Sequence, residues 1–326
     1  MSEVNLVQAV NLALRRAMIE DPHVLVLGED VGVDGGVFRA TDGLLETFGE
    51  SRVIDTPVAE VGITGVSIGL AAQGFRPVVE IQFTGFAYSC IDQLLNHGSR
   101  LRTRTRGRLT CPLVLRSPAG GGIHAVEHHS ESPEAMFSHI PGLKVVIPSS
   151  PAQAYGLLLS AIRDPDSVVF LEPTRLYRAV REDVTDDSAG IPLESCFVLR
   201  PGRDVTLVSW GAMLKETREA AERLNGDGIE AEVIDVATLK PLDSATILDS
   251  VARTGRLVIV HEAPLTGGFG AEIAARVASA GLMSLLAPIE RVAGYDTVMP
   301  YPRTEAHYMP SVDRLMAAAR RVMTYQ

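Results

Sequence analysis

Short apolar runs alternate with helix-length stretches along most of the chain, and no other feature constrains the fold as strongly. Strands of a parallel sheet are buried on both faces, so they read as nearly continuous runs of Val, Ile and Leu. In the first half such runs lie at VLVLGED (24–30), VVEIQF (78–83), PLVLR (112–116), LKVVIP (143–148) and SVVFLEP (167–173). Helices are predicted over 61–73, 89–104 and 151–163, and over a first segment that Asn5 can cap. The alternation predicts an α/β fold, a parallel sheet with helices on both faces.

A polar stretch at residues 181–195, REDVTDDSAGIPLES, interrupts this rhythm. It is acidic and contains Gly and Pro, so we predict a linker there. A second, smaller alternating unit follows, with strands predicted at 204–210, 229–236 and 256–262 and helices at 213–224, 243–253 and 270–280. The chain of 326 residues thus divides into two predicted α/β domains, 1–180 and 196–326.

Charge and composition exclude several classes of function. The formal net charge of −10 disfavours a general nucleic-acid binder, because neutralising phosphates requires a positive surface. An acidic surface does suit docking onto a basic partner. The N-terminal segment has no basic region followed by an apolar run, and no stretch approaches about 18 uninterrupted apolar residues. We therefore expect a cytoplasmic protein that neither spans a membrane nor binds nucleic acid.

The cysteines show neither a disulfide framework nor a zinc site. Cys90, Cys111 and Cys196 are far apart in the sequence and odd in number, which fits neither pattern. We expect three free thiols, buried or half-buried.

The loops after the predicted strands are where a ligand is expected, because open parallel sheets bind ligands at the carboxyl ends of their strands. Glu60 lies in one of them, DTPVAEVG. Pro57 favours an extended entry, and Gly62 begins a helix rich in small residues. An acid at a helix start can simply complement the helix dipole, so spacing alone leaves a structural and a catalytic interpretation open. The small residues behind Glu60 favour the catalytic one slightly, since they permit close packing against a ligand.

Two adjacent histidines, His128 and His129, lie in the Gly-rich loop SPAGGGIHAVEHHSESPEA with His124 and Glu127 nearby. A metal site is weakly supported, because no third ligand joins the pair at helical spacing. Acid–base chemistry fits better, since histidine titrates near neutrality. Solvated surface histidines would give the same pattern, and the residues alone leave both interpretations open.

Two further motifs favour structural explanations. The arginine run RLRTRTRGR (100–108) has no interleaved aromatics, so a helix end or an acidic partner is favoured over nucleic acid. Gly226-Asp227-Gly228 resembles half of the metal–diphosphate motif of thiamine enzymes, but no Asn follows Asn225, so we predict a turn. The chain also lacks a P-loop, a Gly-x-Ser-x-Gly elbow and a dinucleotide fingerprint.

At these motifs the sequence resembles the beta subunits of the thiamine-diphosphate-dependent decarboxylating component of 2-oxo acid dehydrogenase complexes. The first half carries the resemblance in GEDVGVDGGVFRAT, DTPVAEVGITGVSIGLA, EIQF, RSPAGGG, HHSESPEA and PGLKVVIPSSP. The second half carries it in DVTLVSWGAM, EVIDVATLKPLD, TGRLVIVHEAPLTGGFGAEI and GYDTVMPY. Together these motifs are specific and run nearly end to end. The resemblance implies a transketolase-like pyrimidine-binding domain followed by a transketolase-type C-terminal domain.

The same resemblance implies an active site shared between two kinds of chain. Two alpha and two beta chains assemble; the alpha chain supplies the diphosphate and magnesium site, and the beta chain grips the aminopyrimidine. The missing diphosphate motif is thereby explained. The cofactor-activating glutamate of the family falls on Glu60, whose carboxylate hydrogen-bonds a pyrimidine ring nitrogen. A 2-oxo acid is decarboxylated, and its acyl group passes to a lipoyl arm of the acyltransferase core, which docks through its subunit-binding domain.

Further site residues follow from the resemblance. Val58, Gln82 and Phe86 match positions that pack around the pyrimidine. The active-site histidine of the family, implicated in substrate handling and in acyl transfer to lipoamide, aligns with His129. His128 occupies the preceding, variable position and ranks second.

A structural potassium site of the family, formed mostly by backbone carbonyls, also maps onto this chain. It falls on Leu113, Ala161, Ile162, Asp164 and Asp166. Asp166 replaces an Asn that is common there, which puts that ligand in doubt.

Substrate preference is divided between motifs. HEAPLTGGFGAEI, GYDT and HSESPEA favour the branched-chain 2-oxo acid members, whereas Phe86 favours the pyruvate members. We expect a branched-chain 2-oxo acid, with pyruvate as the alternative and acetoin as a lesser one. Outside the family, a self-sufficient thiamine enzyme would need a further diphosphate-binding domain, and a non-catalytic α/β scaffold would show no thiamine-dependent signal.

Overall fold

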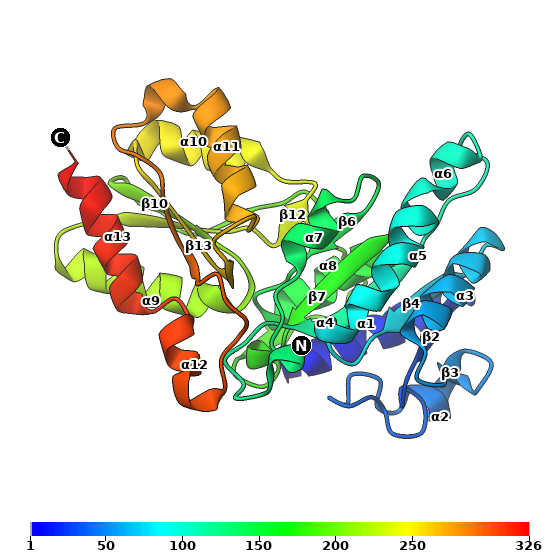
Figure 1. Ribbon diagram of the computed structural model, residues 1–326. Helices are drawn as coiled ribbons and strands as arrows, with labels where there is room; N and C mark the ends of the chain where they lie inside the picture. Colours follow the sequence, from blue (N-terminus) through cyan, green and yellow to red (C-terminus); the bar gives the residue numbers. More distant parts are fainter. Residues whose placement is uncertain (1, 326) are drawn as a thin grey trace. The chain divides into compact units, whose positions relative to one another are not determined.

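The computed structural model describes residues 2–325 and divides into two compact units. Unit 1 comprises residues 1–119 and 136–193, and unit 2 comprises residues 120–135 and 194–326. Residues 120–135 therefore group with unit 2, although in sequence they lie between two strands of unit 1. The predicted α/β architecture is confirmed in both units (Figure 1). The predicted domain limits, 1–180 and 196–326, stay a prediction.

A parallel sheet forms the centre of unit 1, with its strands in the order β6-β7-β5-β4-β2-β3. The strands are β2 (Val24–Gly28), β3 (Val53–Asp55), β4 (Arg76–Glu80), β5 (Val114–Ala119), β6 (Lys144–Val146) and β7 (Val168–Pro173). β2, β5 and β7 are buried along their whole length, which is why their sequences read as apolar runs. Because neighbouring strands run parallel, their carboxyl ends meet at one edge of the sheet.

The helices of unit 1 pack on this sheet and on one another: α1 lies against α8, and α3 lies against β4 and α5. They are α1 (Leu6–Glu20), α2 (Leu44–Phe48), α3 (Glu60–Ala72), α4 (Thr84–Ala87), α5 (Ile91–Asn96), α6 (Leu101–Arg104) and α8 (Pro151–Arg163), with α7 (Glu134–His139) beginning in residues 120–135. The predicted cap of the first helix is confirmed. Asn5 Oδ1 accepts from Gln8 N–H, and Gln8 Oε1 accepts from Asn5 N–H, both at 3.0 Å.

The prediction of one continuous helix over 89–104 is wrong. The chain there forms α5, a 3-10 turn and α6, and His97 leaves the helical conformation at φ −125° and ψ −63°. The buried Gly98 lies at the break, where a Cβ would stand 3.4 Å from Ser167 Oγ. The arginine run does end a helix, as predicted, because Arg104 donates to the carbonyl of Asn96, the last residue of α5.

The centre of unit 2 is a sheet in the order β14-β13-β10-β11-β9, parallel except for β9. The helices and strands in residues 194–326 are β9 (Phe197–Arg200), β10 (Val205–Ser209), α9 (Leu214–Gly226), β11 (Ala231–Asp235), β12 (Thr238–Lys240), α10 (Ser244–Thr254), β13 (Leu257–Pro264), α11 (Gly270–Ala280), β14 (Glu290–Gly294), α12 (Pro302–Tyr308) and α13 (Val312–Thr324). Leu207, Val258 and Leu315 join β10, β13 and α13 in one buried core. The predicted turn after α9 is confirmed, with Gly228 at φ +81°.

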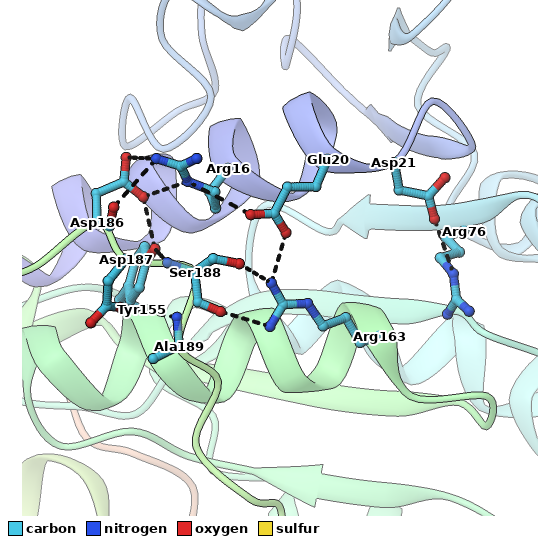
Figure 2. Close-up of polar contacts among 10 residues, drawn as sticks. All are labelled: Arg16, Glu20, Asp21, Arg76, Tyr155, Arg163, Asp186, Asp187, Ser188 and Ala189. Atoms are coloured by element: carbon cyan, nitrogen blue, oxygen red, sulfur yellow. Dashed lines mark hydrogen bonds and ion pairs between the residues drawn. The ribbon is translucent and has the colours of Figure 1, made fainter.

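The stretch predicted as a linker, 181–195, is fixed to unit 1 over most of its length. It begins with β8 (Arg181–Val184), which pairs antiparallel with β1 (Ser2–Asn5). Figure 2 shows the contacts that follow. Arg16 Nη2 donates to Asp186 Oδ2, and Arg163 Nη2 donates to Ser188 Oγ, both at 2.6 Å. The helices α1 and α8, which carry these arginines, therefore anchor the segment.

No helix within residues 2–325 combines the length and the apolar character needed to cross a membrane. The three cysteines are free thiols, as predicted; Cys90 and Cys111 are buried and Cys196 is half-buried.

Candidate active site

The predicted catalytic glutamate lies where the carboxyl ends of β2, β3 and β4 meet. Glu60 is the first residue of α3, and Ala59 at its N-cap provides no side-chain hydrogen bond. The unsatisfied N–H groups of the first turn therefore favour a negative charge at this position. The backbone of Glu60 is held by Thr64, whose Oγ1 donates to the Glu60 carbonyl at 2.8 Å. The half-buried carboxylate is thus placed by the start of a helix whose beginning is fixed.

A second acid, Glu29, lies next to Glu60 and was not predicted as a site residue. It directly follows β2 and is 7% exposed. Burial raises the pKa of its carboxyl group, and the charges of Glu60 and Asp30 raise this pKa further, while a hydrogen bond from the Ala59 backbone lowers it. Within residues 2–325, Glu29 Oε1 has no hydrogen-bond partner. The signal for Glu29 was an acid placed directly after a buried strand.

The residues predicted to contact the pyrimidine lie at or beside the same edge. Gln82 follows β4, and its Nε2 donates to Asp30 Oδ2 at 3.0 Å. Phe86 in α4 is half-buried and meets a neighbouring phenylalanine edge-on, with ring centroids 6.5 Å apart. Val58, just before α3, is 79% exposed. An amide, an aromatic ring and an apolar side chain thus accompany the carboxylate of Glu60, a mixture that suits a polar heteroaromatic ligand.

A buried charge network that we did not predict joins the strands next to this edge. Arg116 on β5 donates to Glu80 on β4 at 2.6 Å and to Glu172 on β7 at 2.7 and 2.9 Å. The Tyr177 hydroxyl donates to Glu172 Oε2 at 2.6 Å. Burial alone would lower the pKa of Arg116, but the two carboxylates outweigh it and raise this pKa. The network ties β4, β5 and β7 together near their carboxyl ends, just before the chain reaches Gln82.

The two histidines belong to unit 2, on a loop of residues 120–133 that we call the His loop. The Gly120 N–H donates to the Glu131 carbonyl at 2.8 Å, which closes the loop on itself. His128 and His129 lie on a 3-10 turn within it. His128 is exposed, with its Nδ1 3.7 Å from a carboxylate oxygen of Glu127, whereas His129 is half-buried. Of the two, His129 is the more enclosed.

A pocket of about 380 Å³ opens beside the His loop in unit 2. Its polar lining consists of Ser130, Glu131, Ser132, Thr266, Asp296, Thr297 and Tyr308. Asp296 accepts from the N–H and from the hydroxyl of Thr266, at 2.9 and 2.6 Å, and these bonds lower the pKa of its carboxyl group. The pocket wall is therefore acidic and rich in hydroxyl groups.

The C-terminal end of the His loop leads into a buried acid. Glu134, the first residue of α7, accepts from Trp210 Nε1 at 3.3 Å. Burial raises the pKa of Glu134 to about 8, and the nearby charge of Glu262 contributes. The ring of Trp210 stacks on His261, with centroids 5.3 Å apart, and burial lowers the pKa of His261 to about 4. Trp210 thus contacts both a buried acid whose pKa is raised and a buried imidazole whose pKa is lowered.

The residues predicted to hold potassium already take part in hydrogen bonds and ion pairs. Leu113 precedes β5, and Ala161, Ile162, Asp164 and Asp166 lie in or after the last turn of α8. The carbonyl oxygens of Ile162 and Asp164 accept from Arg76 Nη1 at 3.0 and 3.3 Å. The side chains of Asp164 and Asp166 pair with Lys144 and Arg102. Each carbonyl keeps a second lone pair for a cation, so the potassium site stays a prediction.

Among residues 2–325, no group of three or more His, Cys, Asp or Glu side chains is arranged to hold a metal ion.

Comparisons with known proteins agree with this geometry. Two family models match the chain: "Transketolase, pyrimidine binding domain" over residues 2–180 and "Transketolase, C-terminal domain" over residues 195–315. The chain is 47% identical over 325 residues to "Pyruvate dehydrogenase E1 component subunit beta" of Bacillus subtilis (strain 168), with 100% of both chains covered. It is 46% and 45% identical, with the same coverage, to proteins of that name from Staphylococcus epidermidis and Staphylococcus aureus (strain Mu50).

The chain belongs to the E1 beta subunits of the 2-oxo acid dehydrogenases. The fold is shared more widely. A solved structure, "Split gene transketolase, inactive beta4 tetramer", matches 99% of this E1 beta chain and 99% of its own with a TM-score of 0.82. Its sequence is 24% identical, so this likeness shows the fold alone. The predicted transketolase-like architecture is confirmed.

E1 beta subunits depend on thiamine diphosphate, and the unit 1 edge fits the aminopyrimidine end of that cofactor. Glu60 and Gln82 bring a carboxylate and an amide to the same edge. The half-buried ring of Phe86 offers an apolar contact beside them. The orphan acceptor Glu29 Oε1 is a buried polar atom of the kind that a bound water or ligand satisfies.

Proposed function

We propose that this E1 beta subunit acts on pyruvate and that unit 1 forms the aminopyrimidine half of a thiamine diphosphate site. The observation that carries the proposal is the carboxylate of Glu60 at the start of α3, at the carboxyl edge of a parallel sheet. When bound, the cofactor supplies the electron sink for cleavage of the bond next to a carbonyl group. The residues of this chain bind and orient its pyrimidine and hold a proton there.

Glu60 exchanges a proton with the pyrimidine in this proposal. Its carboxylate hydrogen-bonds a ring nitrogen of the pyrimidine, which fixes the protonation state of the ring and makes Glu60 a general acid–base group. Glu29 supports that task. Two nearby carboxyl groups resist ionising together, and the raised pKa of Glu29 keeps a proton on Glu29 more readily.

Pyruvate is now better supported than the branched-chain substrate that the sequence motifs favoured. The relatives at 45–47% identity named above are all pyruvate dehydrogenase beta subunits. The place of HEAPLTGGFGAEI in the fold weakens it as a marker of substrate. Its first residue, His261, is fully buried, stacks on Trp210 and bonds the Ala263 carbonyl through Nδ1 at 3.1 Å. The beginning of this motif therefore reflects core packing in unit 2. Phe86, beside the site, was the residue that favoured pyruvate.

We further propose that partner chains complete the reaction. An alpha chain supplies the diphosphate and magnesium site in an assembly of two alpha and two beta chains. His129 handles the substrate and helps to transfer the acyl group to a lipoyl arm of the acyltransferase core, which docks through its subunit-binding domain. A structural potassium ion on the carbonyls near the end of α8 and a cytoplasmic location complete the proposal.

A substrate panel on the alpha–beta assembly tests the proposal. Pyruvate and 3-methyl-2-oxobutanoate are compared with an artificial electron acceptor and saturating thiamine diphosphate. We expect kcat/KM for pyruvate to be higher by about tenfold or more, because each extra methyl group in a fitted pocket changes binding by roughly 1–3 kcal/mol. A preference for the branched acid would reverse the substrate assignment. Absence of thiamine-dependent turnover with either acid would overturn the function.

A further inference from the structure

The His loop is held in unit 2 by two carboxylates, Glu262 and Glu305, to which the sequence analysis gave no role. The Gly121 N–H donates to Glu262 Oε2 at 3.0 Å, and the Gly122 N–H donates to Glu305 Oε1 at 2.9 Å. The His124 N–H also donates to Glu305, at 3.2 Å from Oε2. Three backbone donors from the first part of the loop therefore converge on two acids from other elements.

The backbone conformation of the loop makes this convergence possible. Gly120, Gly122 and His124 have positive φ angles of +87°, +78° and +59°. A backbone that alternates in this way turns neighbouring N–H groups toward a common anion. A Cβ at residue 120 would stand 2.8 Å from Glu262 Oε1, so the close approach requires glycine there. The backbone of the Gly-rich sequence thus binds the two carboxylates through its N–H groups.

The two acids come from well-packed elements of unit 2. Glu305 lies in α12 and is 2% exposed, and Glu262 lies in β13. His124 Nε2 lies 3.4 Å from Glu305 Oε2, and its ring is exposed. A buried carboxylate is stable as an anion only when donors surround it, so the loop N–H groups stabilise Glu305 and Glu305 fixes the loop.

The remaining contacts of the loop place His129 between two fixed ends. At the first end stand the bonds to Glu262 and Glu305. At the second end Glu134 bonds Trp210, and the Gly120–Glu131 bond closes the loop. The 3-10 turn that carries His129 lies between these points in the sequence.

We propose that Glu305 and Glu262 are positioning residues for His129. By fixing the backbone of the His loop, they set the direction in which the imidazole is presented. The inference rests on the proposed role of His129 in substrate handling and acyl transfer, and it adds two residues of the C-terminal part of the chain to that role.

A double-mutant cycle on the alpha–beta assembly tests this inference, with pyruvate as substrate and a free lipoyl domain as acyl acceptor. Glu305→Ala is expected to lower turnover roughly tenfold to a hundredfold, because a displacement of about 1 Å at a reacting group has effects of this size. In a His129→Ala background the same substitution is expected to change turnover by less than about twofold, since the positioned group is gone. An equal loss in both backgrounds would overturn the inference.

Glu232→Ala is the matched control. Glu232 is also a buried acid of unit 2; it accepts from the Gly202 N–H at 3.3 Å and pairs with Arg253. Its removal is expected to lower stability while turnover per assembled enzyme stays within about twofold, as for sites that do not share a partner. A loss as large as that of Glu305→Ala would make the effect a general consequence of removing a buried acid.

Glu305→Gln covers the case in which Glu305→Ala does not assemble. Gln keeps one acceptor oxygen for the loop N–H groups but loses the charge, so an intermediate loss is expected in the same cycle. Full turnover of this variant would contradict the inference. Full turnover of His129→Ala itself would show instead that the proposed role of His129 fails, which separates the two hypotheses.

Discussion

The buried acids of unit 1 and of unit 2 have different hydrogen-bond and ion-pair partners. In unit 1, Glu80 and Glu172 share the guanidinium of Arg116. In unit 2, Glu134 accepts from its own backbone N–H and from the indole N–H of Trp210, and Glu305 is held by backbone N–H groups and an exposed histidine. Burial raises the pKa of Glu80, and the cation Arg116 opposes that rise. Burial raises the pKa of Glu134 to about 8, and the groups that oppose this rise are neutral N–H donors, its own backbone and the Trp210 indole.

This difference indicates which interactions hold the proposed site residues in each unit. A charge network within three strands gives unit 1 a fixed sheet edge, and Glu60 stands on that edge. Carboxylates that bind a loop give unit 2 a site whose geometry depends on hydrogen bonds to backbone N–H groups. We therefore expect substitutions in unit 1 to affect cofactor activation or global stability, and substitutions in unit 2 to affect the His loop and its pH dependence.

The largest expected effect is that of Glu60→Gln. The amide keeps the shape of the side chain but cannot exchange a proton with the pyrimidine, so turnover should fall by about 10²- to 10⁴-fold while the assembly stays intact. Turnover of pyruvate with an artificial electron acceptor measures this. Glu46→Gln, another glutamate in the first turn of a helix of unit 1, should be silent. Normal turnover of Glu60→Gln would remove this residue from the mechanism.

The next largest effect is expected for Arg116→Met. Two buried carboxylates would lose their common cation, and loss of one partner from such a network destabilises by about 3–5 kcal/mol. Denaturant unfolding of the assembled protein measures the change. Arg102→Met is the matched control, because Arg102 forms a partly exposed pair with Asp166 and such pairs contribute about 1 kcal/mol or less. Equal losses of unfolding free energy in both variants would show that the buried network contributes no more to stability than an exposed ion pair.

An effect that is smaller per pH unit, and visible only as a pH dependence, is expected for Glu134→Gln. The folded-state pKa of Glu134, about 8, lies above its unfolded value of about 4.3, so the folded state binds more protons between these values. Its contribution to stability is full below the unfolded pKa and is lost as pH rises through the folded pKa. The slope is at most about 1.4 kcal/mol per pH unit. Gln mimics the protonated acid and should remove this slope.

Thermal unfolding of both proteins at pH 5 and pH 8 measures the difference. The difference in unfolding temperature between wild type and Glu134→Gln should shift in favour of the variant at the higher pH. Other titrating groups affect both proteins equally and cancel in this difference. Parallel curves would show that Glu134 does not titrate in this window.

Local patterns predicted the elements that depend on local physics. The helix predicted over 151–163 is α8 (Pro151–Arg163), because Ser150 caps it and Pro151 suits the first position. The break at His97 was missed, because the residues around it continue a helical pattern; a Cβ on the next residue, Gly98, would stand 3.4 Å from Ser167 Oγ, a neighbour that is distant in sequence. Short strands such as β3 carry too few residues to show a period.

In the candidate site, too, local features could be predicted from the sequence and contacts between distant residues could not. The position of Glu60 after a strand and at a helix start is local and could be predicted, whereas its catalytic role rests on the resemblance and stays a prediction. The Arg116 network joins residues 36 and 56 positions apart, and the bonds from the His loop to Glu262 and Glu305 span 141 and 183 positions. Pairings of this range follow from the tertiary fold, and no local spacing in the sequence marks them.

The central claim is that this chain carries one half of an active site. Pyruvate turnover by the purified chain, measured with thiamine diphosphate, magnesium and an artificial electron acceptor, with and without its alpha chain, tests it most directly. The account predicts no turnover for the chain alone and full turnover when the alpha chain is added, lost again in the Glu60→Gln variant. Turnover by the chain alone at the rate of the assembly would contradict it.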